Sequence, residues 1–308
     1  MTHQHRITGE DASARLDQVL ARRLDLSRRQ VTRLLERGLV RVNGQRVDRA
    51  AKGRRLLNGD ELQVDPFTPE AAQRPVPAPH LRLHVVAEAD DWLIVNKPAH
   101  MAVHPLRPEE DDTLLNAVIA RHPRIHGVGE GGLRSGVVHR LDLTTSGVVL
   151  FALDQVQWQR LRDAFRTHAI TKRYRALVHG PLTGEGHDTL PLVIRQHHPA
   201  RVTVADRMQR QARNCSLRWR VLETFDDAAH VEIELETGFL HQIRVMLAHR
   251  GHPLVGEAVY GGESPLADRP LLHALSLTWQ DVHGESEPPA DFTDRLVALR
   301  QHGTLHFR

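Results

Sequence analysis

Val137-Val138-His139-Arg140-Leu141-Asp142-Leu143-Thr144-Thr145-Ser146-Gly147-Val148-Val149-Leu150-Phe151 is a polar segment enclosed by two apolar ones. The β-branched and apolar residues at both ends predict buried strand, and the polar residues between them predict a turn at a strand end. Arg140 and Asp142 then stand beside the core, where a carboxylate is costly unless it is paired and hydrogen-bonded. Gly147 permits a tight or left-handed backbone. The residues alone support two interpretations: a hairpin turn closed by an Arg140–Asp142 ion pair, or a functional carboxylate.

The polar part of this stretch resembles a known signature. His139-Arg140-Leu141-Asp142, followed after two residues by Thr145-Ser146-Gly147, is similar to the signature of the RluA-type family of RNA pseudouridine synthases. Seven identities within nine positions make this resemblance far more specific than a lone glycine pattern. The resemblance implies that Asp142 is the catalytic residue.

A second family motif is matched further along the chain. Thr171 to Val178 alternates as a strand that places Lys172 and Tyr174 on one face. From the residues alone, Tyr174 could be a core aromatic residue with a satisfied hydroxyl. The Lys-x-Tyr resemblance implies instead that Tyr174 lies against the target uracil.

A third motif is matched at His241-Gln242-Ile243-Arg244, which leads into a predicted helix. The alternative is an ordinary surface arginine on that helix. The resemblance implies that Arg244 pairs with Asp142. The family usually has arginine and then threonine or serine before this His-Gln, whereas this chain has Phe239 and Leu240. We therefore expect the substrate contacts at these two positions to differ.

The chemistry of the reaction limits what the site must contain. Forming pseudouridine breaks the C–N bond between base and sugar, turns the base and joins its C5 to C1′, with no atoms gained. Neither a cofactor nor a metal is required, and a single carboxylate suffices. Asp142 could attack C1′, attack the uracil ring or assist loss of the 2′ proton, and the sequence leaves these routes open. Because the base must leave its stack, we expect further RNA contacts from the residues around the motifs, namely His139, Arg140, Lys172 and Ile243.

Positive charge is concentrated at the N-terminus. Residues 1–65 hold 14 lysines and arginines against 9 acidic residues, a net charge of +5, whereas the rest of the chain has a net charge of −2. A helix predicted to begin after Ser27 has Arg28, Arg29 and Arg33 on its polar side, and we expect these three to contact RNA. A biased genomic composition would also explain an arginine excess.

The pattern of elements predicts an α+β fold. Residues 14–65 read as two short helices and a small hairpin, which resembles the small RNA-binding domain first known from a ribosomal protein. Residues 66–80 are rich in proline and predict a linker. Residues 81–308 predict a mixed, mainly antiparallel central sheet with flanking helices, the pseudouridine synthase fold. No regular element is predicted in the polar, histidine-rich residues 181–215.

Composition excludes several protein classes. The chain is 40% hydrophobic and 26% charged, which suits a globular protein. No apolar run approaches the roughly 18 residues that a membrane span needs. A single cysteine, Cys215, is consistent with a reducing compartment, so we expect a cytoplasmic protein. The 22 histidines are scattered without the spacing of a metal site, so no metal is expected.

Substrate and partners are less constrained. In the resembled family, an N-terminal module of this kind usually accompanies enzymes that act on large-subunit ribosomal RNA, which is the expected substrate, with transfer RNA as the alternative. We expect a monomer. A non-catalytic RNA-binding factor of ribosome assembly stays open, as does a glycoside hydrolase. The latter normally needs two carboxylates about 5–10 Å apart, and no second acidic residue lies inside the motifs.

Overall fold

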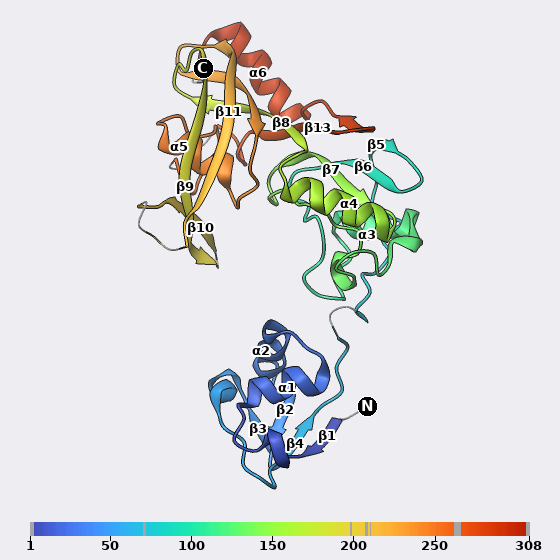
Figure 1. Ribbon diagram of the computed structural model, residues 1–308. Coiled ribbons are helices and arrows are strands. Elements are labelled where there is room, and N and C mark those ends of the chain that lie inside the picture. Colours follow the sequence, from blue (N-terminus) through green and yellow to red (C-terminus); the bar gives the residue numbers. More distant parts are fainter. Residues whose placement is uncertain are drawn as a thin grey trace. The chain divides into compact units, whose positions relative to one another are not determined.

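The computed structural model describes residues 3–69, 72–197, 199–206, 209, 211–261 and 266–305, without the side chain of Arg29. The chain forms two compact units, residues 1–73 and 74–308. Figure 1 shows the elements of each unit, coloured along the sequence. No helix within the described ranges is long and apolar enough to cross a membrane.

The first unit combines two helices with a four-stranded antiparallel sheet in the order β1-β4-β2-β3. Its elements are β1 (His3–Arg6), α1 (Leu16–Leu24), α2 (Arg28–Glu36), β2 (Val40–Val42), β3 (Gln45–Val47) and β4 (Glu61–Val64). Helix α2 begins where the sequence predicts, because Ser27 Oγ accepts from Gln30 N while Gln30 Oε1 accepts from Ser27 N. Strand β1, which pairs with β4, was not predicted.

The predicted linker, residues 66–80, makes contacts in both units. Phe67 packs against the hydrophobic core of the first unit. Ala78 is fully buried in the second, where its N–H donates to the carbonyl of Asn116 over 3.0 Å. The domain limits 14–65, 66–80 and 81–308 stay a prediction.

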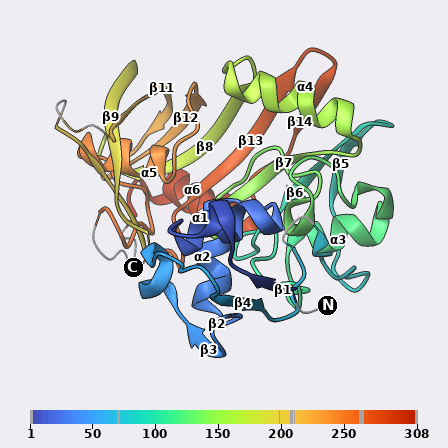
Figure 2. The same ribbon diagram turned by 60° about the horizontal axis from the view of Figure 1, so that its bottom comes forward.

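The second unit is built on one large sheet in the order β10-β9-β11-β12-β8-β13-β7-β6-β5, with β14 paired to β13. Figure 2 shows β8, β13 and β7 side by side in the middle of this sheet. Among the described strands only β13 and β7 pair in parallel, so the predicted mixed, mainly antiparallel sheet is confirmed. The strands are β5 (Val85–Glu88), β6 (Trp92–Lys97), β7 (Ser146–Ala152), β8 (Thr171–His179), β9 (Glu185–His197), β10 (Ala200–Val204), β11 (Arg213–Thr224), β12 (Ala228–Leu235), β13 (Leu272–Trp279) and β14 (Val282–Glu285).

Helices pack around this sheet. They are α3 (Leu114–Arg121), α4 (Gln155–Arg166), α5 (Gln242–His249) and α6 (Ala290–His302). Helix α4 contacts β7, and α5 contacts β9 and β10 (Figure 1). Helix α6 buries Phe292, Leu296 and Leu299 in a cluster with Leu177 of β8. This arrangement confirms the α+β class.

Two local expectations were wrong. Residues 181–215 contain the long strand β9 and also β10, although no element was predicted there. Strand β9 pairs with β11 while many of its side chains stay exposed, so its polar composition hid the strand. In the stretch 137–151, only its second apolar half is a strand, since Val137 makes a single bridge to Phe151.

Gly147 is a point beside the site at which the backbone needs glycine. Its φ is +119°, and a Cβ atom at this position would collide with the backbone of Ala274 on β13. Because β7 and β13 pair there, the turn that precedes β7 lies at the junction of the two parallel strands.

Candidate active site

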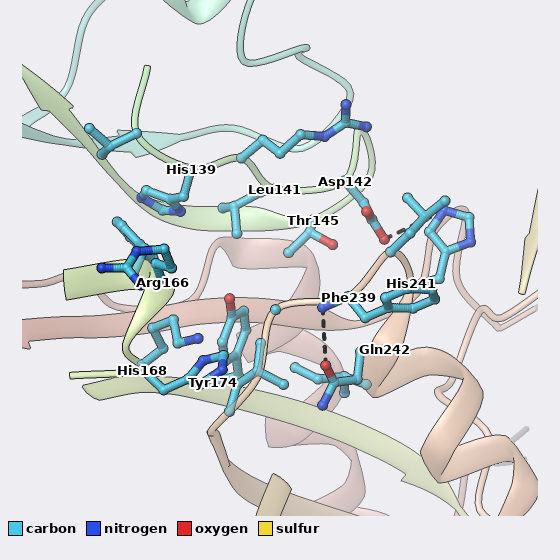
Figure 3. A pocket seen from close by; sticks show the side chains of 18 of the residues that line it. His139, Leu141, Asp142, Thr145, Arg166, His168, Tyr174, Phe239, His241 and Gln242 are labelled. Carbon is cyan, nitrogen blue, oxygen red and sulfur yellow. Dashed lines mark hydrogen bonds and ion pairs between the residues drawn. The ribbon is translucent and has the colours of Figure 1, made fainter. Parts of the chain in front are cut away.

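A cavity of about 1030 Å³ opens in the second unit beside the turn before β7. Its walls come from the motif residues 138–142, residues 158–166 of α4, the start of β8 and residues 238–244 at the beginning of α5. Figure 3 shows Asp142, Tyr174 and Phe239 around this space. The structure therefore brings three segments with separate sequence motifs to one cavity.

Two buried cations hold the turn after Asp142. Lys97 is fully buried at the end of β6, and its Nζ donates to the carbonyl of Leu143 at 3.2 Å and to two further carbonyls at 2.8 Å. Arg269 Nη1 donates to the carbonyl of Thr144 at 3.2 Å. Burial lowers the pKa of Lys97 to about 7, while its three carbonyl acceptors favour the ammonium form. These hydrogen bonds to the carbonyls of Leu143 and Thr144 fix the backbone that follows Asp142.

Asp142 and Arg244 lie together, as the motifs imply. Arg244 Nη1 is 3.4 Å from Asp142 Oδ2, and the Asp142 side chain is 20% exposed toward the cavity. Arg140 is exposed at the cavity wall. An Arg140–Asp142 ion pair is absent among the described residues, so the hairpin-turn interpretation is wrong in this respect.

Glu257 holds Arg244 more closely than Asp142 does. Arg244 Nε and Nη2 donate to the two oxygens of Glu257 at 2.7 and 2.8 Å. Both residues are buried, with Glu257 only 1% exposed. Burial lowers the pKa of Arg244, but the Glu257 carboxylate and then Asp142 more than offset this, so the net pKa is raised. The cation that faces Asp142 is therefore permanent.

Tyr174 and Lys172 come from β8 on its buried face. Both are more than nine-tenths buried and both line the cavity. Burial, and secondly the charge of Asp142, raise the pKa of Tyr174 well above its usual value, so its hydroxyl stays protonated. Burial lowers the pKa of Lys172 to about 8.

His139 connects the polar stretch to β7. Its Nε2 accepts a hydrogen bond from Leu150 N at 2.9 Å, and its ring stacks on Phe165 of α4 with centroids 4.8 Å apart. Burial lowers the pKa of His139 to about 3, so the imidazole is neutral and can accept. This bond ties the motif to β7 in addition to the single bridge between Val137 and Phe151.

The other predicted site residues are distributed differently. Ile243 is buried in the hydrophobic core and also lines the cavity. Phe239 and Leu240 stand at the cavity wall, partly buried. Arg28 and Arg33 lie exposed on α2 of the first unit. The side chain of Arg29 lies outside the described part of the chain.

Sequence reasoning missed three polar residues near the site. They are His241, Glu257 and Arg269. His241 stood inside a recognised motif, and its Nε2 is 3.8 Å from Asp142 Oδ2. Glu257 follows Gly256, whose left-handed φ of +82° marks a tight turn, but its partner is 13 positions away. No motif or spacing in the sequence around Arg269 indicated that it lies near the site.

Comparison with known proteins agrees with this geometry. A family model described as RNA pseudouridylate synthase matches residues 91–249, and the S4 domain model matches residues 14–53. The ribosomal large subunit pseudouridine synthase D of Haemophilus ducreyi is 32% identical over 325 residues, covering 97% of this chain and 96% of its own. An uncharacterized RNA pseudouridine synthase of Mycobacterium bovis is 36% identical over 307 residues, covering 95% of this chain and 96% of its own.

A solved structure shows the same fold. The human RNA pseudouridylate synthase domain containing 4 protein superposes with a TM-score of 0.59 at 24% identity, covering 70% of this chain and 93% of its own. The predicted resemblances, to the RluA-type synthases and to the small N-terminal RNA-binding domain, are confirmed. This chain belongs to the family of RNA pseudouridine synthases, which are isomerases, and has an S4 domain at its N-terminus.

Proposed function

We propose that this enzyme converts uridines of large-subunit ribosomal RNA to pseudouridine through the carboxylate of Asp142. The observation that supports this most is the placement of Asp142 at the cavity wall, 3.4 Å from a buried arginine. The substrate assignment draws on the name of the Haemophilus ducreyi relative, which covers nearly the whole chain.

Each motif residue has a role in this proposal. Asp142 is the one carboxylate that attacks C1′ or the uracil ring, or assists loss of the 2′ proton. Arg244 keeps it charged and oriented. The ring of Tyr174 lies against the uracil. After the new C–C bond forms, its protonated hydroxyl acts as a relay, in which the oxygen accepts the C5 proton while releasing its own, and N1 gains a proton. Neither a metal nor a cofactor enters this reaction.

Contacts around the flipped nucleotide come from other residues. Arg140, exposed at the cavity wall, fills the space that the base vacates or binds the flanking phosphate. Lys172 and Ile243 line the cavity in which the base is held, and Lys172 adds a positive charge. His139 acts beside them by fixing the backbone of residues 139–142 through Leu150.

The first unit supplies affinity that does not depend on sequence. Arg28, Arg29 and Arg33 contact RNA phosphates from helix α2, in a segment of strongly positive charge. Tethering such a module to the catalytic unit raises the local concentration of RNA near the cavity. We further propose that the enzyme is a cytoplasmic monomer, which light scattering and fractionation would test.

Glu257 does not supply the second carboxylate that a glycoside hydrolase needs. Glu257 is a second carboxylate close to Arg244, which the sequence motifs did not include. Both of its oxygens accept hydrogen bonds from Arg244 and it is buried, so it cannot act as the acid or base partner of Asp142.

The test is pseudouridine mapping of total RNA from cells that lack the gene, complemented with wild type or with Asp142→Asn. We expect signals in large-subunit ribosomal RNA to vanish in the deletion and to return only with wild type. Signals lost from transfer RNA alone would replace the substrate assignment. Restoration by Asp142→Asn would overturn the role of Asp142 and favour a non-catalytic assembly factor. Equal RNA binding by both purified proteins is the required control.

A further inference from the structure

His241 occupies an unusual position beside the catalytic carboxylate. Its backbone is left-handed, with φ +52° and ψ +22°, directly before helix α5. Its side chain is only 13% exposed, and Figure 3 shows it on the same side of the cavity as Asp142. A non-glycine residue in this backbone region is uncommon and is found where the surrounding structure has a use for it.

The partners of His241 determine which of its ring nitrogens bears the proton. Tyr260 Oη accepts a hydrogen bond from Val202 N on β10 at 3.1 Å and lies 2.7 Å from His241 Nδ1. Among the described residues no other acceptor is hydrogen-bonded to this hydroxyl, so donation to Nδ1 is the arrangement that satisfies its proton within the protein. The proton of the neutral imidazole is then on Nε2.

This tautomer directs an N–H group at Asp142. His241 Nε2 is 3.8 Å from Asp142 Oδ2, the same oxygen that Arg244 Nη1 approaches at 3.4 Å. Both donors therefore converge on Oδ2 and leave Oδ1 without a partner among the described residues. A distance of 3.8 Å exceeds a hydrogen bond, but such contacts in empty active sites often shorten when substrate binds.

The charges around His241 support a neutral ring. Burial is the main cause of its lowered pKa, and the cations Arg244 and Arg140 lower it further. Asp142 and Glu257 act in the opposite direction without overcoming these effects. Tyr260 is the remaining titratable group in contact with the ring, and its own pKa is raised by burial.

We propose that His241 is a positioning residue for Asp142, with Tyr260 selecting the tautomer that donates from Nε2 to Oδ2. When RNA fills the cavity, this donor and Arg244 hold Oδ2, so that Oδ1 is the oxygen that meets the substrate. The inference rests on the proposed role of Asp142.

Two substitutions of His241 separate this role from a structural one. In His241→Gln the amide nitrogen reaches the place of Nε2 and can still donate to Asp142, whereas in His241→Asn the shorter amide cannot. Asparagine, however, adopts the left-handed backbone more readily than glutamine. A donor role therefore ranks glutamine above asparagine, and a purely structural role ranks them the other way.

The measurement is the single-turnover rate of the full chain on a large-subunit ribosomal RNA transcript that wild type converts. We expect His241→Gln to lose about tenfold or less and His241→Asn about a hundredfold, as for a hydrogen bond to a charged group. RNA affinity is expected to change by less than about twofold, since the effect lies in the chemical step. A rate for asparagine equal to or above that for glutamine would overturn the proposal.

Tyr260→Phe tests the tautomer. Arg244 Cζ lies 5.4 Å from the centroid of the Tyr260 ring. The variant retains this ring and loses only the hydroxyl. We expect a slowing of about fivefold in the wild-type background and none in His241→Gln, which has no tautomer to select. Equal slowing in both backgrounds would contradict this coupling. Wild-type turnover by Asp142→Asn would instead defeat the proposed function itself.

Discussion

Glu257 accepts two hydrogen bonds from Arg244, at 2.7 and 2.8 Å, whereas Asp142 lies 3.4 Å from the remaining guanidinium nitrogen. The buried glutamate thus fixes the plane of the guanidinium and balances its charge, while the guanidinium itself stays protonated. The cavity-facing aspartate receives a weaker, single contact. Asp142 is therefore oriented by a cation whose own position does not depend on it.

Glu257→Gln should weaken both the fold and the reaction. Removing one partner of a buried ion pair leaves an uncompensated charge and typically costs about 3–5 kcal/mol. We expect a loss of free energy of unfolding of about 3 kcal/mol and a single-turnover rate lowered by at least about tenfold. Urea unfolding and quenched-flow conversion of a transcript are the measurements.

The matched control for that variant is Glu130→Gln. Glu130 pairs with Arg134 at 3.2 Å on the surface, where both side chains are more than 40% exposed. Such pairs contribute about 0–1 kcal/mol, so stability and rate should barely change. Similar losses in the two variants would show that the burial of Glu257 has no special effect.

Tyr174→Phe should separate the ring of the tyrosine from its hydroxyl. The phenyl ring fills the same buried space, so RNA affinity is expected to be unchanged, while removal of the C5 proton slows. We expect a rate loss of about tenfold or more, with a kinetic isotope effect appearing on substrate deuterated at C5. If Tyr174→Phe is slow but shows no isotope effect, the hydroxyl acts in a step other than removal of the C5 proton.

His139→Gln should change how the free energy of unfolding depends on pH. The folded pKa of His139 is about 3, below its ordinary value of 6.5, so the unfolded chain takes up the proton first as pH falls. Wild type therefore loses stability from about pH 6.5 downward, by up to about 1.4 kcal/mol per pH unit for this group. Glutamine can accept from Leu150 N without titrating, so the slope for the variant should be flatter between pH 6.5 and 4. Parallel slopes in thermal melts would contradict this assignment.

Phe239→Arg places at this position the arginine that is usual in the family. Phe239 stands at the cavity wall and packs partly against the core. A new cation there should strengthen RNA binding at low salt and steepen the plot of log affinity against log salt by about 0.7–0.9. Phe239→Leu is the control, with no expected change in slope. Equal slopes for both variants would indicate that position 239 does not approach the RNA backbone.

The sequence by itself determined most of the local structure. Alternation predicted strand β8 with Lys172 and Tyr174 on one face, which the structure buries, and the Ser27 cap predicted the start of α2. These elements depend on spacing within a few residues, which is visible along the chain. The motif around Asp142 was equally local. Strand β9 was not predicted, because many of its residues are polar and exposed, and polar composition on an exposed face does not distinguish a strand from a loop.

Tertiary structure alone decided how the catalytic turn is held. Asp142 and Arg244 stand 102 positions apart, and Arg269 reaches Thr144 across 125. Glu257 showed no role until Arg244 was placed beside it. A buried charge needs a partner that is near in space, whichever part of the chain supplies it. Local periodicity cannot specify that partner, because only the packing of the sheet and helices brings the two side chains together.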